Sequence, residues 1–288
     1  MGYLDLGPLK LGEILDRMFV IYRRNFLLLF SIAGLPFLCL LPLVLVAFFS
    51  GSFSIFNPQN PQVAPTPDQI LSFVAVAFVA AFILILGLLA SWLATTAAVW
   101  QLQMGGQPTI RKVYRVAWHK FGTAFLAAMV IGAGLFAGYL FLLIPAIFVA
   151  LETCLTLSAI VAEDVGAFKA LSRSHTLISG YRGRVFVAWL VCYAVSTAVS
   201  YAIVIPPVIG MMFYIRSGSL PGWLIAILIL AYFLALTVPA PLLAIVLCLI
   251  YYDARVRKEG FDLQRLLDEL PPATPGIAPG STPGIAVS

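Results

Sequence analysis

The apolar stretch 122–162, GTAFLAAMVIGAGLFAGYLFLLIPAIFVALETCLTLSAIVA, is nearly uninterrupted in this 288-residue chain. One helix over its whole length would measure about 60 Å, roughly twice the thickness of the hydrocarbon core of a bilayer. Pro145 lies near the middle, where a proline removes a backbone donor and clashes with the preceding turn. The stretch therefore predicts two helices, 122–144 and 145–162, joined by a tight hairpin.

Apolar segments of membrane-spanning length recur on both sides of this pair. The chain is 62% hydrophobic and 10% charged, whereas soluble domains carry about 25% charged residues. The composition thus predicts an all-α integral membrane protein with six transmembrane helices across 26–252. The other four predicted spans lie near 26–50, 70–102, 184–214 and 221–252.

The basic residues indicate how these spans are oriented. Of 17 Lys and Arg residues, all except Arg216 fall in segments that alternate spans place on one side of the membrane. Loops rich in Lys and Arg stay cytoplasmic, so we expect a multi-pass plasma-membrane protein with cytoplasmic N- and C-termini. The net charge of +5 is explained by this topology, and we do not expect nucleic-acid binding.

Amphipathic segments flank the spans and suggest a repeat. Residues 1–25 and 253–270 are predicted as cytoplasmic amphipathic helices, and 110–121 and 165–181 have a similar character. We read three parallel units, each an interfacial helix followed by a helical hairpin, although any cytoplasmic loop beside a bilayer tends to be amphipathic. The tail 271–288, which contains TPGIA twice, is predicted to be disordered.

The basic faces of these segments predict binding to anionic lipid headgroups; a protein partner is left open. The predicted headgroup contacts are Arg17, Arg23, Arg24, Arg111, Lys112, Arg115, Lys120, Arg173, Arg182, Arg184, Arg255, Arg257 and Lys258.

Glu152 is the one ionisable residue placed well inside a predicted span, with Thr153 and Thr156 close to it. A carboxylate within a membrane is costly and marks a functional site by default, here a proton or cation site. The alternative is that Glu152 is hydrated near an interface or bonds to a neighbouring helix. Glu163, Asp164 and Asp253 stand at span ends, where caps or pairs with loop bases are expected; Asp164 is predicted as an N-cap of the 165–181 helix.

The remaining polar and small residues predict packing rather than chemistry. Gly134 and Gly138 form a G-x-x-x-G face suited to close helix contact, within the chain or in a dimer. The four cysteines are dispersed, and His119 and His175 have no acidic partner at a fixed spacing, so we expect no metal site, no cofactor and no catalytic residues.

Three stretches, LGEILDRMFVIYRRNF near the start, VAEDVGAFKALSRSHTLISG in the middle and LIYYDARVRKEGFDLQRL near the end, resemble the membrane-domain family associated with bacterial glycerophosphoryl diester phosphodiesterases. The resemblance covers roughly 9–267 and implies a bacterial six-helix membrane domain. In some members this domain precedes a phosphodiesterase barrel of about 250 residues, and no metal-binding residue of that barrel carries over to this chain.

Two functions remain open at this point. The first is a non-enzymatic module that binds a lipid or a protein partner, and the second is a small transporter or channel that uses Glu152. A transporter should gather several polar residues at the midplane, and the spans offer few besides Glu152, so the sequence favours the first.

Overall fold

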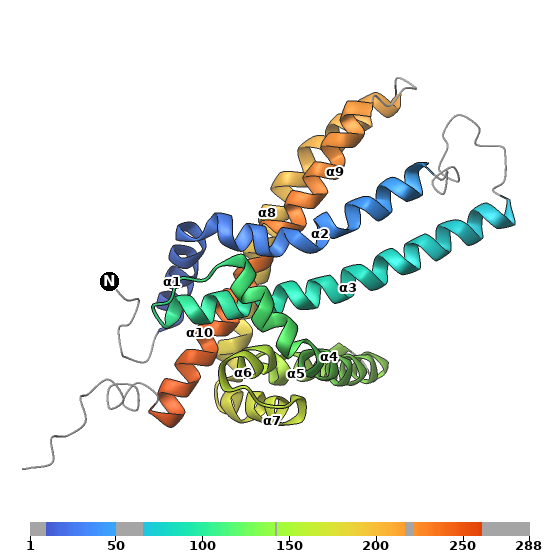
Figure 1. Ribbon diagram of the computed structural model, residues 1–288. Helices are drawn as coiled ribbons and strands as arrows, with labels where there is room; N and C mark the ends of the chain where they lie inside the picture. The colour runs from blue at the N-terminus through green and yellow to red at the C-terminus, as the bar shows by residue number, and fades with distance from the viewer. Residues whose placement is uncertain (1–9, 50–65, 142, 217–221, 261–288) are drawn as a thin grey trace, which may run out of the picture.

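The computed structural model describes residues 10–49, 66–141, 143–216 and 222–260, and every element in these ranges is an α-helix (Figure 1). The prediction of an all-α protein with several long apolar helices is confirmed. Five helical segments are long and apolar enough to cross a membrane, or six if the pair Leu11–Arg24 and Phe26–Cys39, bent by 82°, is one span. The helices are α1 (Leu11–Arg24), α2 (Phe26–Phe49), α3 (Pro67–Gln103), α4 (Ile110–Leu140), α5 (Leu143–Thr153), α6 (Thr156–Glu163), α7 (Ala167–Ile178), α8 (Arg182–Arg216), α9 (Gly222–Thr237) and α10 (Ala240–Glu259).

Two of the predicted spans are interrupted by a proline. In each, the preceding helix ends about four residues before that proline. In the first, α4 ends at Leu140, before Pro145 is reached, and Pro145 lies in the first turn of α5. In the second, predicted near 221–252, α9 ends at Thr237 and Pro241 follows in the first turn of α10. The reason is the same in both, since a proline ring clashes with the carbonyl four residues earlier but is tolerated in a first helical turn.

Three other boundaries differ from the sequence-based expectation. Residues 110–121 are not a separate interfacial helix but the first turns of α4, because no breaker separates them from the apolar part. Residues 253–259 likewise continue α10, and the rest of the helix predicted over 253–270 lies outside the described residues, as does the tail 271–288. The span predicted over 145–162 is divided into α5 and α6.

α10 is the central helix of the fold. It contacts α1, α3, α6, α7 and α8, and nearly all of its residues from Pro241 to Val256 are buried. We call the assembly of α1, α6, α7, α10 and residues 110–121 of α4 the base. Its core includes Ile14 and Met18 of α1, both with 0% exposure. The apolar face of α1, expected to lie in the acyl boundary, therefore packs against protein.

Three hairpins extend from the base: α2/α3, α4/α5 and α8/α9, the members of each in contact. In Figure 1, α2/α3 and α8/α9 diverge from the centre, whereas α4 and α5 extend to the lower right of the line formed by α8, α9 and α10. Large apolar side chains are exposed along all three, including Phe78 (74%), Phe136 (70%) and Phe213 (71%). Two tyrosine hydroxyls connect helices that are distant in the sequence. Tyr22 of α1 donates to the carbonyl of Val238 at the α9–α10 break (2.6 Å), and Tyr114 of α4 donates to the carbonyl of Ile32 in α2 (2.8 Å).

Candidate functional site

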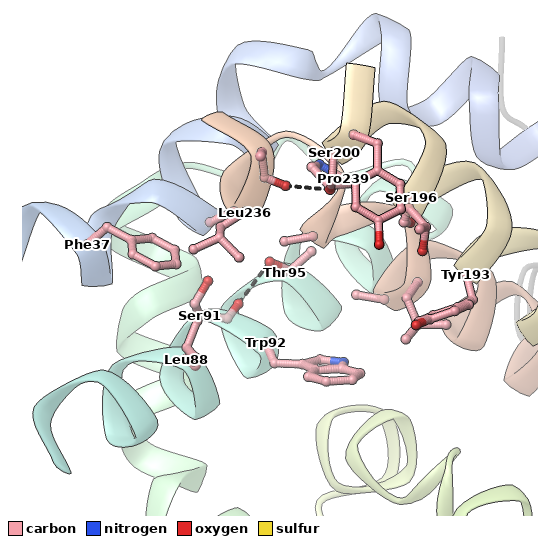
Figure 2. A pocket seen from close by; sticks show the side chains of 17 residues that line it. Phe37, Leu88, Ser91, Trp92, Thr95, Tyr193, Ser196, Ser200, Leu236 and Pro239 are labelled. Atoms are coloured by element: carbon pink, nitrogen blue, oxygen red, sulfur yellow. Dashed lines mark hydrogen bonds between the residues drawn. The ribbon is translucent and has the colours of Figure 1, made fainter. Parts of the chain in front are cut away.

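A pocket of about 600 Å³ opens between α2/α3 and α8/α9, beside the break that separates α9 from α10 (Figure 2). Its walls are mainly apolar, from Phe37, Leu88, Trp92, Leu236 and Leu243. The break itself brings Pro239 and Ala240 to the lining, which a continuous helix would arrange differently. Ligand pockets of proteins fall in the range of roughly 300–1,000 Å³, so this space is large enough for a small ligand or a lipid chain.

Hydroxyl groups are the polar component of this pocket. They come from Ser91, Thr95, Tyr193, Ser196, Thr197, Ser200 and Tyr201. Three are used within the protein: Ser91 donates to the carbonyl of Ile32 (3.1 Å), Thr95 to that of Ser91 (2.8 Å) and Ser200 to that of Ala235 (2.8 Å).

The other four hydroxyls of the lining have no hydrogen bond to any part of the chain that the structure describes. No charged residue is among the lining residues. The pocket therefore suits a largely apolar molecule with a neutral polar group. The sequence reasoning missed this site because its serines and threonines come from helices about a hundred residues apart, and only the tertiary structure brings them together.

Glu152, the residue singled out in the sequence, lies at the break between α5 and α6 and does not line this pocket. Its carboxylate is bound by Arg182 (2.5 Å from Nη2 to Oε1) and faces His175 (3.0 Å from Nδ1 to Oε2). All three side chains are partly exposed, Glu152 the least at 29%. The sequence shows no acidic partner at a fixed spacing from His175, and the partner is distant in the chain: α7 returns antiparallel to α6 and brings His175 to Glu152.

Ser174 explains how the chain tolerates this break. Its buried hydroxyl donates to the carbonyl of Glu152 (2.6 Å) and accepts from the amide of Leu155 (3.2 Å). Thr153 donates to its own helix, at the carbonyl of Val149 (2.7 Å). The hydroxyl of Thr156 is buried and has no partner among the described residues. The two threonines therefore do not join Glu152 in a common site.

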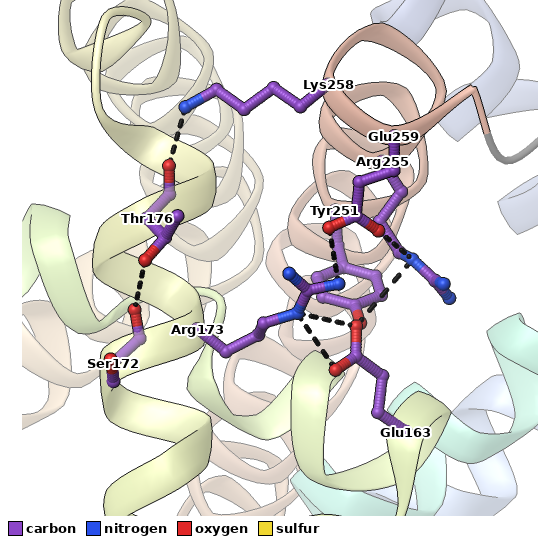
Figure 3. A network of polar contacts seen from close by, with 8 residues as sticks. All are labelled: Glu163, Ser172, Arg173, Thr176, Tyr251, Arg255, Lys258 and Glu259. Atoms are coloured by element: carbon purple, nitrogen blue, oxygen red, sulfur yellow. Dashed lines mark hydrogen bonds and ion pairs between the residues drawn. The ribbon is translucent and has the colours of Figure 1, made fainter.

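Four further charged residues, Glu163, Arg173, Arg255 and Glu259, form a network in the base (Figure 3). The carboxylate of Glu163 accepts from Arg173 Nε (2.9 Å) and from the hydroxyl of Tyr251 (2.5 Å). Arg255 binds Glu259 (3.0 Å) and approaches Glu163 (3.6 Å), and Arg173 also pairs with Glu259. The network ties α6, α7 and α10 together. Glu163 thus pairs with bases, one of the two roles expected for it.

The predicted headgroup contacts divide into two groups. Seven of them bind groups of the protein itself: Lys120, Arg173, Arg182, Arg184, Arg255, Arg257 and Lys258. Arg17 and Arg24 also have interactions within the chain. Arg111, Lys112 and Arg115 are exposed on α4 beside Trp118, whose exposure is 77%. Arg23 is likewise exposed, on α1, and these four are the residues whose predicted role fits their exposure best.

Asp164 has a different role from the one expected. It is the C-cap of α6, with a left-handed φ of 53°, and the N-cap of α7 is Gly166. Aspartate is among the few residues that adopt this conformation at modest cost. Its carboxylate binds Lys120 (2.8 Å), and this hydrogen bond, together with the charge of Lys120, lowers the pKa of Asp164.

Gly134 and Gly138 lie where α4 packs on α5. A Cβ atom at Gly138 would stand 2.7 Å from the backbone of Ala146, and one at Gly134 would stand 3.3 Å from Val149. The close approach is therefore within the chain. Among the described residues, no group of three or more His, Cys, Asp or Glu side chains is arranged to hold a metal ion.

Comparison of this chain with known protein families, with curated proteins and with solved structures finds no match in any of the three.

Proposed function

We propose that this protein is a non-enzymatic lipid-binding module of the plasma membrane, which holds the apolar part of a lipid in the pocket between α2/α3 and α8/α9. The observation that carries the proposal is the composition of that pocket: apolar walls, no charged lining residue and four uncommitted hydroxyls. Acyl chains match the walls, and an ester or hydroxyl near the glycerol would match the hydroxyls.

The position of the pocket supports a ligand that arrives from the membrane. Trp92, Tyr193, Tyr201 and Leu236 line it and are themselves 40–60% exposed. These residues lie on helices apolar enough to cross a membrane. A lipid could therefore enter sideways from the bilayer without passing through water.

The proposed location is the bacterial plasma membrane, with the base and both termini on the cytoplasmic side. The distribution of Lys and Arg supports this orientation. The bacterial origin rests on the resemblance to the phosphodiesterase-associated membrane domains, which remains a proposal.

The alternative, a small transporter or channel, rests on Glu152. In the structure this carboxylate already has two basic partners, and it lies outside the pocket. A carboxylate that is paired in this way is less suited to exchange protons or cations than an isolated one. Proton-coupled flux in wild type that disappears in Glu152→Gln would revive this alternative.

The test of the lipid-binding proposal is native mass spectrometry of the full chain, extracted gently from its own membrane. We expect one lipid bound to the wild-type protein. In Ser196→Trp the indole would occupy the pocket, and the adduct should be lost. Ala198→Trp is the matched control, because Ala198 is exposed on the same helix and does not line the pocket.

The outcomes distinguish the possible explanations. Loss of lipid in Ser196→Trp and retention in Ala198→Trp would support the pocket as the binding site. A lipid retained by Ser196→Trp would contradict it, as would a wild-type protein that carries no lipid or carries a protein partner in its place.

A further inference from the structure

We propose that the α4/α5 hairpin does not cross the bilayer but lies along one face of it, with its apolar end immersed in the leaflet next to the base. The partner of this surface is the acyl layer of that single leaflet. The inference is independent of the proposed lipid pocket. It revises only the third and fourth of the predicted spans.

The first argument concerns the depth of charge. If α5 and α6 crossed the membrane with Glu163 at one surface, Glu152 would lie about 16 Å deeper, near the midplane. His175 and Arg182 would be at the same depth, because both contact the Glu152 carboxylate. Three ionisable groups at the centre of a bilayer would be costly even when paired. A crossing orientation is therefore unfavourable for this part of the chain.

The second argument compares the positions along α10 at which the two ends of the α6–α7 layer make contact. Glu163, at the end of α6, contacts Tyr251 and Arg255. At the other end of α7, the carbonyl of Ser179 accepts a hydrogen bond from Lys258 (2.6 Å). Arg184, at the start of α8, pairs with Asp253 (3.2 Å). Both ends of the α6–α7 layer thus meet the last two turns of α10, about 12 Å of helix.

The layer must consequently run across α10 rather than alongside it. α4 follows the same direction, since Lys120 contacts the end of α6 and Gly138 contacts Ala146 near the start of α5. In Figure 1, α4 and α5 extend to one side of the line formed by α8, α9 and α10. When α8, α9 and α10 cross the membrane, α4 to α7 lie in the plane of its surface. Glu152, Glu163 and their partners then share one depth, at the interface.

The third argument is the composition of the exposed surface. The end of the hairpin exposes Phe136, Leu140, Phe141 and Ile144, each by 67–75%. The opposite end of α4 exposes Arg111, Lys112 and Arg115 beside Trp118. Aromatic and basic residues of this kind settle at the headgroup level, and apolar ones below it. A second copy of the chain could cover the apolar end, but it would not explain the exposed basic residues at the opposite end of α4.

A hairpin that enters and leaves the same face does not change the side on which later segments lie. The distribution of Lys and Arg along the sequence therefore fits a crossing hairpin and a surface hairpin equally well. The arrangement of side chains in space distinguishes the two, beginning with Glu152, His175 and Arg182.

The experiment places single cysteines in the full-length chain, in a Cys39→Ala background because Cys39 is exposed. Leu140→Cys marks the end of the hairpin, and Phe136→Cys serves if that variant does not fold. Asp68→Cys marks the far end of α3, and Ile85→Cys marks the interior of α3. Intact cells are treated with a membrane-impermeant maleimide, and spin-labelled protein is reconstituted in phosphatidylcholine with phosphatidylglycerol for depth measurement.

We expect Asp68→Cys to react from outside and Leu140→Cys to remain unlabelled, with its spin label in the acyl region but shallower than the label at Ile85. Labelling of Leu140→Cys from outside, at a rate similar to Asp68→Cys, would show a crossing hairpin and overturn the proposal. Rapid disulfide-linked dimers through Leu140→Cys would overturn it too, because a second copy would then cover the apolar end.

Discussion

The base and the hairpins differ in what covers their apolar side chains. In the base, Ile14, Met18 and Ile21 of α1 are fully buried against other helices, as they would be in a water-soluble protein. Along the hairpins, residues of the same kind, such as Phe78 and Phe136, are largely exposed. Most ion pairs of the described residues lie within the base. Two others involve the start of α8, where Arg182 pairs with Glu152 and Arg184 pairs with Asp253.

This difference shows that the two regions are stabilised by different forces. The base gains free energy when apolar groups leave water and when buried charges are paired. The outer hairpins gain nothing from mutual burial in lipid, since acyl chains are as apolar as leucine, and depend on close packing at small residues. Substitutions should therefore have effects that depend on the region in which they fall.

The largest expected effect comes from the charge network of the base. Glu163→Ala leaves Arg173, Arg255 and Tyr251 without their shared acceptor, and we expect a loss of about 3–5 kcal/mol, as for removal of one partner from a buried ion pair. Thermal unfolding in a mild detergent measures the loss. The control is Glu152→Ala, where the partly exposed partners His175 and Arg182 can be rehydrated, with a cost of about 1 kcal/mol or less. Equal losses in the two variants would contradict the distinction.

The next largest difference in stability between the two regions is expected when an apolar side chain is truncated. Met18→Ala creates a cavity among fully buried residues of the base, and we expect a loss of about 2–5 kcal/mol. Phe136→Ala removes a larger side chain from the exposed surface of α4 and should change stability in detergent by about 0.5 kcal/mol or less. A loss in Phe136→Ala as large as that in Met18→Ala would mean that protein, not lipid, covers the hairpin.

Glycine substitutions test packing inside the α4/α5 hairpin. Gly138→Ala places a methyl group 2.7 Å from the backbone of Ala146 and should destabilise the protein by about 1–3 kcal/mol, as overpacking does. Gly132→Ala meets no atom within 4 Å and should instead stabilise α4 by up to about 1 kcal/mol. Opposite signs for the two variants are the expected result in thermal unfolding, and a neutral Gly138→Ala would show that the helices can separate at little cost.

The smallest expected effect is electrostatic and depends on pH. Because Lys120 lowers the pKa of Asp164 in the folded state, the pair stabilises the fold above the unfolded pKa of about 3.9 and loses this contribution as the pH falls through the lowered value. Asp164→Asn keeps a residue suited to the left-handed conformation and removes the charge. Wild type should melt slightly higher than this variant at neutral pH, and the difference should disappear once the pH falls below the lowered pKa of Asp164. A difference that persists in acid would assign the effect to the backbone instead.

The elements of this protein were largely predictable from local sequence, because they depend on periodicity and on breakers. Apolar segments of spanning length indicated the α-helices, and Pro145 indicated a break close to the observed one. The exact break four residues earlier follows from the proline clash with the carbonyl of Phe141, and Pro241 ends α9 in the same way. The junctions at 121 and 252 were misplaced because an amphipathic pattern does not by itself end a helix.

The sequence by itself determined that the chain is helical and apolar, since composition and spacing suffice for these properties. Only the tertiary structure decided which charges meet. Glu152 reads as an isolated carboxylate, yet α7 brings His175 to it and the start of α8 brings Arg182. Met18 belongs to the amphipathic segment before the first span, yet it is fully buried in the base beside Cys192 of α8. Seven serine, threonine and tyrosine hydroxyls gather in one pocket because two hairpins converge beside a broken helix. Such contacts join segments up to two hundred residues apart, and no local pattern encodes them.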